Sequence, residues 1–195
     1  MFGNILNNSQ ILRLMKDQNQ IQIVPFDENR LKLAHYALSP AGIIEPQKLQ
    51  KSGHYSKPPI RHFDENNEYL FEANEYAVVE VDQMILLKDG LVGHFIPSST
   101  FIDGGFALTA GKLDPGYGAL GGQRQSVRFG VKNLLNESNT LYGDEPIAHV
   151  YFIDMRGLNS NPFGFSEVQE QRFVNERSAR FKRARDDGPD YGDGS

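Results

Sequence analysis

The stretch LVGHFIPSSTFIDGGFALTAGKLDPGY, residues 91–117, decides the fold class. Two short apolar segments, residues 91–96 and 106–109, flank a polar Ser- and Thr-containing loop, and the stretch closes on an Asp-Pro-Gly turn sequence. Short strands separated by Gly, Asn, Asp and Pro residues are typical of a β-sandwich or a β-barrel. The stretch therefore predicts a mainly β protein.

The sequence on both sides of this stretch continues the pattern. Short β-branched or alternating segments, as expected of strands, occur at residues 21–24, 75–81, 84–87, 127–131 and 147–153. An apolar face at residues 10–17 predicts one N-terminal helix, and Ser9 is its expected N-cap because a Ser hydroxyl can accept the first free N–H groups.

The C-terminal part of the chain has a different composition. Residues 166–184 begin with a capping Ser166 and an acidic first turn, which predicts a helix, and residues 186–195 have the acidic, Gly-rich composition of disordered tails. We expect a β domain over residues 1–160, a helical appendage over 161–185 and a disordered acidic tail over 186–195. The basic cluster at residues 177–185 fits either a nucleic-acid arm or a solvated helix face paired with the acidic tail, and we favour the second interpretation.

Composition excludes several classes of function. The net charge of −5 gives no overall field that would attract nucleic acid or an anionic membrane. The absence of Cys excludes disulfides and thiolate metal sites, and the five His residues show no close metal-ligand spacing, so no protein-bound metal is expected. No apolar run approaches the roughly 18 residues of a membrane span, and residues 1–10 do not resemble a signal peptide. We therefore expect a cytoplasmic protein.

Three segments, in order, resemble the dCTP deaminase branch of the dCTP deaminase/dUTPase superfamily. Residues 21–38, IQIVPFDENRLKLAHYAL, resemble the opening strand, the Pro-Phe-Asp segment and the Ser-Tyr-Asp-Leu turn of that family. Residues 91–111 resemble its Gly-Arg-Ser-Ser motif followed by Thr-Ala-Gly, and residues 113–117, LDPGY, resemble its Ile-Asp-Pro-Gly-aromatic signature. The resemblance covers about residues 9–155.

The resemblance implies a fold, an assembly and a type of ligand. Members of the superfamily have a jelly-roll-like subunit that forms homotrimers, with active sites at the subunit boundaries. A deoxynucleoside triphosphate binds there with its phosphates on the Ser-rich motif, and Mg²⁺ binds to the phosphates. Deaminases use a Glu on the strand after the aromatic residue as the proton shuttle, whereas dUTPases use an Asp to activate water. We therefore expect a dUTPase-like jelly-roll or β-barrel subunit in a homotrimer that binds a deoxynucleoside triphosphate with Mg²⁺.

The same resemblance implies roles for particular residues. Asp114 matches the dUTPase general base, and Ser98 and Ser99 match the phosphate-binding hydroxyls. The remaining substrate-binding residues that the resemblance implies are Thr109, Gly111 and Tyr117. Arg124 is expected to bind substrate for another reason: it lies on an insertion at residues 118–126 that the family pattern lacks, and it can supply a replacement cation. Each role has a plain structural alternative, because Asp-Pro-Gly is a turn sequence by itself and Ser residues are common in loops.

The chain departs from the family at the residues that perform chemistry. Pro97 stands where the family has its phosphate-binding Arg, and Ile102 stands where deaminases have a second Arg. Counting back three residues from Asn133 places Gly130 at the position of the proton-shuttling Glu. Ala37 replaces the Asp of the first motif. Neither Pro nor Ile can hold the charge of a triphosphate, and Gly cannot act as a general acid or base.

Two functions remain open on these grounds. The first is a non-catalytic nucleotide-binding or assembly protein that retains the scaffold and has lost the chemistry. The second is a dUTPase-like diphosphohydrolase in which Asp114 activates water and Lys112, Arg124 or Arg128 replaces the missing Arg residues. The residues favour the first function slightly.

Overall fold

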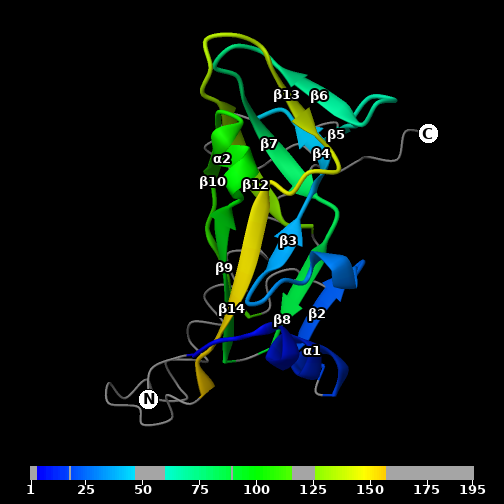
Figure 1. Cartoon of the computed structure of the whole chain (residues 1–195), viewed down its shortest axis with the longest axis vertical. Helices are drawn as coiled ribbons and strands as arrows, with labels where there is room; N and C mark the ends of the chain where they lie inside the picture. Colours follow the sequence, from blue (N-terminus) through cyan, green and yellow to red (C-terminus); the bar gives the residue numbers. More distant parts are fainter. Residues whose placement is uncertain (1–3, 18, 47–59, 89, 116–125, 157–195) are drawn as a thin grey trace, which may run out of the picture. The chain divides into compact units, whose positions relative to one another are not determined.

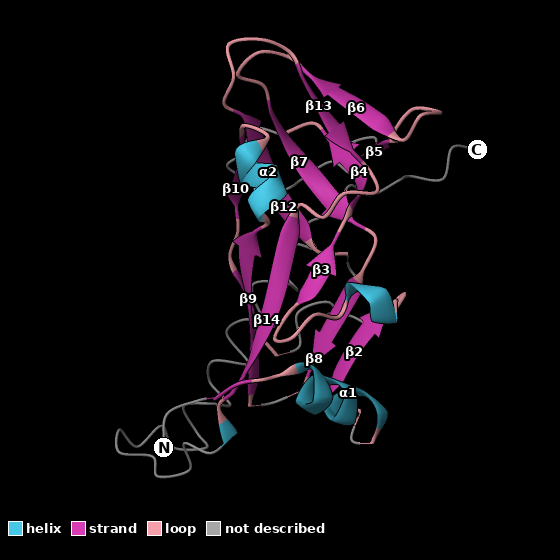
Figure 2. Cartoon of the chain, viewed as in Figure 1, coloured by secondary structure: helices cyan, strands magenta, loops and turns pink. Residues whose placement is uncertain are grey.

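Antiparallel strands make up most of the chain that the computed structural model describes, which comprises residues 4–17, 19–46, 60–88, 90–115 and 126–156. These residues lie in one unit of the chain. The predicted C-terminal helix and tail, and the loop that carries Tyr117 and Arg124, lie outside the described residues. The mainly β architecture with a short N-terminal helix is as predicted (Figure 2).

The first five-stranded sheet is built around its longest strand pair. Its strands are β1 (Asn4–Ile5), β3 (Tyr36–Leu38), β9 (Leu91–Pro97), β11 (Lys112–Leu113) and β14 (Ala148–Asp154). Strand β14 pairs with all seven residues of β9 along one edge. Along its other edge β14 pairs with β3 and β1 (Figure 1).

The second five-stranded sheet carries Gly130, the residue that the family resemblance places at the proton-shuttle position. Its strands follow the order β10 (Phe106–Thr109), β12 (Arg128–Asn133), β7 (Tyr76–Val81), β4 (Pro40–Ile44) and β5 (Ile60–Arg61). The remaining described strands form two two-stranded ribbons. In one, β6 (Glu68–Phe71) pairs with β13 (Asn139–Tyr142), and in the other, β2 (Ile21–Val24) pairs with β8 (Met84–Leu87). The predicted strand at residues 127–131 begins one residue later and continues to Asn133.

The two five-stranded sheets pack face to face. The ring of Phe95 on β9 lies 5.0 Å from the ring of Phe129 on β12 in an edge-to-face arrangement. Phe129, Phe152 and Val131 are fully buried in the same apolar cluster. Alternation along β12, in which exposed Arg128 and Lys132 separate the buried residues, is what places this apolar face between the sheets.

Helices are short in the described part of the chain. Helix α1 (Asn8–Lys16) buries Ile11 and Leu14, and the turn η1 spans Glu28–Arg30. The prediction that Ser9 caps α1 was wrong, because the cap is Asn7, whose side chain accepts from the backbone N–H of Gln10 while the Gln10 side chain accepts from that of Asn7. No helix in the ranges described above is long and apolar enough to cross a membrane.

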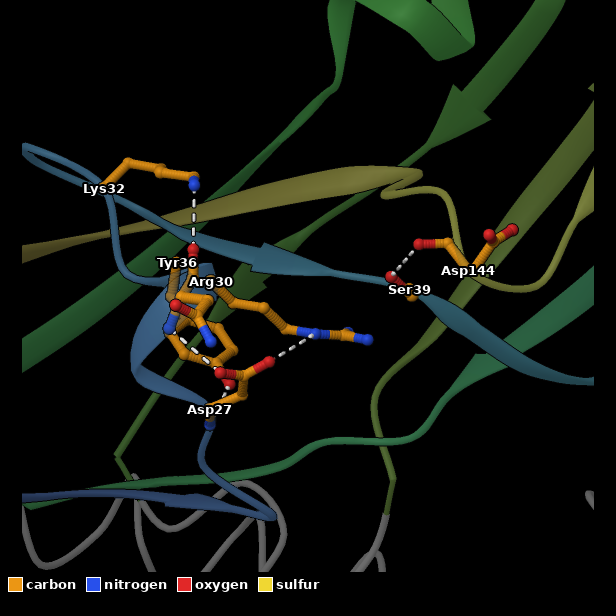
Figure 3. A network of polar contacts seen from close by, with 7 residues as sticks. Asp27, Arg30, Lys32, Tyr36, Ser39 and Asp144 are labelled. Atoms are coloured by element: carbon orange, nitrogen blue, oxygen red, sulfur yellow. Dashed lines mark hydrogen bonds and ion pairs between the residues drawn. The ribbon is translucent and has the colours of Figure 1, made fainter.

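A polar network fixes the segment between β2 and β3 (Figure 3). The Asp27 carboxylate accepts from the backbone N–H of Asn29 and pairs with Arg30 at 3.7 Å. The backbone N–H of Asp27 donates to the hydroxyl of Tyr36, whose ring is fully buried. This network positions β3 against β14, and burial raises the pKa of Tyr36. The hydroxyl of Ser39, at the junction of β3 and β4, donates to the backbone oxygen of Asp144.

Asn133, at the end of β12, is the most completely bonded buried polar side chain among the described residues with printed contacts. Its amide donates to the backbone oxygens of Glu72 and Glu137 at 2.9 and 2.8 Å, and its oxygen accepts from the backbone N–H of Leu135 at 3.0 Å. The side chain is fully buried. It therefore ties the turn that follows β12 to the segment that follows β6, through hydrogen bonds made away from solvent.

We expect Asn133→Asp to destabilise the protein by about 2–4 kcal/mol, because a buried carboxyl would face two carbonyl oxygens in place of an N–H donor. Urea denaturation at neutral pH measures this loss. Asn136→Asp, at an exposed site on the following turn, is the matched control and should change the free energy of unfolding by less than about 0.5 kcal/mol. Equal losses in both variants would show that the network carries no special stability.

Candidate functional site

The segment that resembles a phosphate-binding motif begins where β9 ends. Ser98 is buried and caps the five-residue helix α2 (Ser99–Asp103), with its oxygen accepting from the backbone N–H of Phe101 at 3.2 Å. The same hydroxyl donates to the backbone oxygen of Pro146 at 2.5 Å. The Ser98 hydroxyl therefore has a structural task in this protein. Ser99 is exposed and is the member of the pair that solvent reaches.

Residues 97–103, which end β9 and form α2, contain no Lys or Arg. Pro97 ends β9, and the side chain of Ile102 is 54% exposed at the position where the family resemblance calls for an Arg. The segment following β9 therefore presents hydroxyl and backbone groups to solvent, without the guanidinium groups that usually hold a triphosphate.

Asp114 follows β11, the short strand that pairs with β9. Its carboxylate is a quarter exposed and lies 3.1 Å from the ammonium group of Lys112. The pairing of Lys112 with His94 and of Leu113 with Gly93 fixes the strand that delivers this carboxylate. A half-buried carboxylate beside one cation can accept a hydrogen bond from water or from a sugar hydroxyl.

Gly130 lies in the middle of β12, between Thr109 on β10 and Val78 on β7. A Cβ atom placed on Gly130 would lie 2.1 Å from the Thr109 hydroxyl oxygen and 2.2 Å from the Tyr76 hydroxyl oxygen. The Thr109 hydroxyl also donates to the backbone oxygen of Gly130 at 3.1 Å. The hydroxyls of Thr109 and Tyr76 therefore occupy the position that the Cβ atom of any other residue at position 130 would take.

The other sequence-predicted site residues fall into two groups. Gly111 is exposed, with open space where a Cβ would stand, so the backbone there is accessible to a ligand. Tyr117 and Arg124 lie outside the described residues. Of the cations considered as replacements for the missing Arg residues, Arg128 pairs with Glu80 at 2.7 Å across β12 and β7. Lys112 pairs with Asp114, so each of these two described cations already has a carboxylate partner.

Sequence reasoning missed two features of this region. The ring of Tyr76 lies over Gly130, which follows from the register of β7 and β12 and could not be read from spacing along the chain. His35 and His149 form a stacked pair with ring centroids 4.1 Å apart and an interplanar angle of 25°. These two histidines are far apart in the sequence, so the pair could not be predicted from spacing along the chain. The described ranges contain no group of three or more His, Asp or Glu side chains that could hold a metal ion.

The stacked histidines are both held in the neutral state. Burial lowers the pKa of His35, and the nearby charge of Lys32 lowers it further. Burial also lowers the pKa of His149, and His35 adds to the effect. Since the unfolded chain has ordinary His pKa values near 6.5, it takes up protons before the folded chain does. Stability contributed by this pair is therefore present above pH 6.5 and is lost as the pH falls towards the lowered pKa values.

We expect the free energy of unfolding to fall with pH below about 6.5, and His149→Gln should reduce the steepness of that fall. Urea denaturation at pH values on both sides of this window measures the slope, which is informative even if the variant is less stable overall. His62→Gln, at an exposed site, is the matched control and should leave the slope unchanged. A slope that His149→Gln does not reduce would contradict the assignment.

Comparisons with known proteins identify the fold. No protein-family model and no curated protein matches the sequence. Among solved structures, the 2′-deoxycytidine 5′-triphosphate deaminase of Agrobacterium tumefaciens matches with a TM-score of 0.59 and 17% identity over 83% of this chain. This chain spans about half of that protein, 52% of its length. The match shows that the described chain has the fold of a dCTP deaminase, which confirms the structural part of the resemblance.

Phage dUTPases also match, at lower similarity. The dUTPase of Staphylococcus bacteriophage 80alpha, with bound dUpNHpp, has a TM-score of 0.45 and 15% identity, covering 77% of this chain and 89% of the phage protein. A dUTPase variant from phage phi11 of S. aureus, described with a structural Mg(II) ion, has a TM-score of 0.46 and 13% identity, covering 75% of this chain and 96% of that one.

Proposed function

We propose that this chain is a nucleotide-binding or assembly protein on the dCTP deaminase fold that does not deaminate nucleotides. The observation that carries the proposal is the filled space at Gly130. If that position corresponds to the proton-shuttling Glu of deaminases, as the motif spacing implies, the Tyr76 and Thr109 hydroxyls stand in its place. A phenol and an alcohol can donate hydrogen bonds to a bound base, but at neutral pH neither can shuttle protons as a carboxylate does.

The region around α2 can bind a nucleotide through hydrogen bonds but offers little electrostatic attraction for its phosphates. The exposed Ser99 and the accessible backbone at Gly111 offer hydrogen bonds to phosphate or sugar oxygens, while the lack of Arg at Pro97 and Ile102 weakens any hold on a triphosphate. Mg²⁺ would bind here through the phosphate oxygens of the nucleotide.

A second function is favoured by Asp114. A half-buried carboxylate beside Lys112, at the end of a strand anchored to β9, has the character of a general base. In this alternative the protein is a dUTPase-like diphosphohydrolase, and Asp114 deprotonates the water that attacks the phosphate chain. The two functions differ in turnover and share the same proposed binding site.

We expect a deoxynucleoside triphosphate with Mg²⁺ to raise the melting temperature, while neither ammonia from dCTP nor pyrophosphate from any dNTP exceeds a no-protein control. A ligand at 100 times its dissociation constant stabilises by about 2.7 kcal/mol, or roughly 5–10 °C for a chain of this size. A thermal-shift panel of dNTPs and NTPs, followed by ammonia and pyrophosphate assays, makes the measurement. Ammonia release from dCTP would overturn the proposal.

Pyrophosphate release would instead favour the hydrolase, and Asp114→Asn then decides whether Asp114 is its base. This variant nearly preserves shape, so it should leave nucleotide binding intact while lowering the rate roughly 10²- to 10⁴-fold. Asp17→Asn, at the exposed end of α1, is the charge-matched control and should retain the full rate. Hydrolysis that persists in Asp114→Asn would place the base elsewhere.

We also propose that the jelly-roll subunit assembles as a homotrimer, with support from the fold alone. Multi-angle light scattering at micromolar concentration should give about three times the subunit mass. Dilution into the nanomolar range tests whether the assembly is obligate. A monomer at all concentrations would remove the model of a site shared between subunits.

A further inference from the structure

A separate pocket lies between α2 and β13, and Ser99 is not among the residues that line it. Figure 2 shows α2 beside β10. The cavity has a volume of about 210 Å³. Its floor is formed by side chains that are almost fully buried: Phe101, Phe106, Leu141 and Ile147. The rings of Phe101 and Phe106 stack at 5.2 Å with an interplanar angle of 19°, so the floor includes a flat aromatic surface.

The walls of this pocket are held in place by hydrogen bonds. The Ser98 hydroxyl donates to the backbone oxygen of Pro146, which joins the start of α2 to the loop before β14. The Asn139 amide donates to the backbone oxygen of Gly104 at 2.7 Å, which joins β13 to the end of α2. Both bonds connect walls of the same cavity. The pocket is therefore preformed, and a ligand would not have to order it.

The rim of the pocket is polar and carries one formal charge. Thr100, Thr140 and Tyr142 supply hydroxyl groups, and Glu145 supplies the one carboxylate among the lining residues. None of the described residues that line the cavity is a Lys or an Arg. An anionic ligand would find no countercharge here, whereas a cation would find Glu145 and the exposed ring of Tyr142, both of which attract positive charge.

We propose that this pocket binds a compact aromatic ring that carries a cationic amine on a short linker. The ring packs on the apolar floor, where aromatic groups gain most from burial, and the amine lies at the rim beside Glu145. The inference does not rest on the proposed nucleotide function, because the pocket shares none of the residues Ser99, Gly111 and Asp114.

Tryptamine is a suitable probe because this chain contains no Trp, so indole fluorescence reports the ligand alone. We expect saturable binding with a dissociation constant of roughly 10⁻⁴–10⁻³ M, as for a good fragment-sized ligand. Two further probes change the charge on the side chain of the indole: 3-methylindole has no head group and is neutral, and indole-3-propionate is anionic. The expected order of affinity is tryptamine, then 3-methylindole, then indole-3-propionate. Equal affinity for all three, or no saturable binding, would overturn the proposal.

Two adjacent carboxylates provide a matched pair of variants. Glu145→Gln should weaken tryptamine binding about three- to fivefold and leave 3-methylindole binding unchanged, because an exposed ion pair contributes modestly. Asp144→Asn removes the same charge one residue away, on a side chain that does not line the cavity, and should change tryptamine affinity less than twofold at physiological salt. Equal effects of the two variants would show that the protein attracts the amine by overall charge and not through this rim.

A third comparison tests the location of the ring. Thr140→Phe fills the cavity from β13 and should abolish binding of both tryptamine and 3-methylindole, whereas the nearly isosteric Thr140→Val should retain it. If Thr140→Phe does not fold, the Glu145 and Asp144 variants still decide the proposal. A Thr140→Phe protein that folds and binds tryptamine normally would refute it. The dNTP thermal shift should be the same in all of these variants, which separates a failure of this proposal from a failure of the nucleotide proposal.

Discussion

The pairing of β14 along both of its edges is the constraint on which the described fold depends. One edge holds β9 through seven residue pairs, and the other holds β3 and β1, which come from the beginning of the chain. Because β9 leads directly into α2, this ladder also fixes the candidate phosphate segment. The Ser98 hydroxyl then ties α2 to the loop that precedes β14. One strand near the end of the described chain thus positions both candidate binding sites.

The sequence predicted strands in which apolar residues recur at every second position and missed strands with a less regular pattern. Strand β12 was found because the apolar residues Phe129 and Val131 alternate with other residue types along it. Strand β4 was missed because it starts with Pro40 and contains Gly42, which read as turn residues, although Pro is tolerated at the first position of a strand. Helix α2 was missed because five residues are too few to show a helical period. The cap of α1 was misplaced by two residues since Asn7 and Ser9 are both good caps.

The candidate site also has features that the sequence predicted and features that it did not. Motif spacing was enough to single out Asp114 and Gly130, because turn sequences and strand ends can be counted along the chain. The hydrogen-bond partners and contacts of individual side chains could not be predicted from spacing along the chain. Ser98 bonds to a backbone oxygen 48 residues away, and the Tyr76 hydroxyl reaches Gly130 across a strand register. Such contacts are decided by tertiary packing, which a single sequence does not encode in any local pattern.

The crowding at Gly130 also constrains how this protein could change over evolutionary time. Any single substitution at that position brings a Cβ atom into the Thr109 and Tyr76 hydroxyls, so one or both of these side chains would have to shift. Tyr76 is 41% exposed, so its ring has room to move towards solvent. A carboxylate acquired at position 130 would therefore depend on a change in the rotamer of Tyr76, and a smaller residue at position 76 would make that acquisition easier.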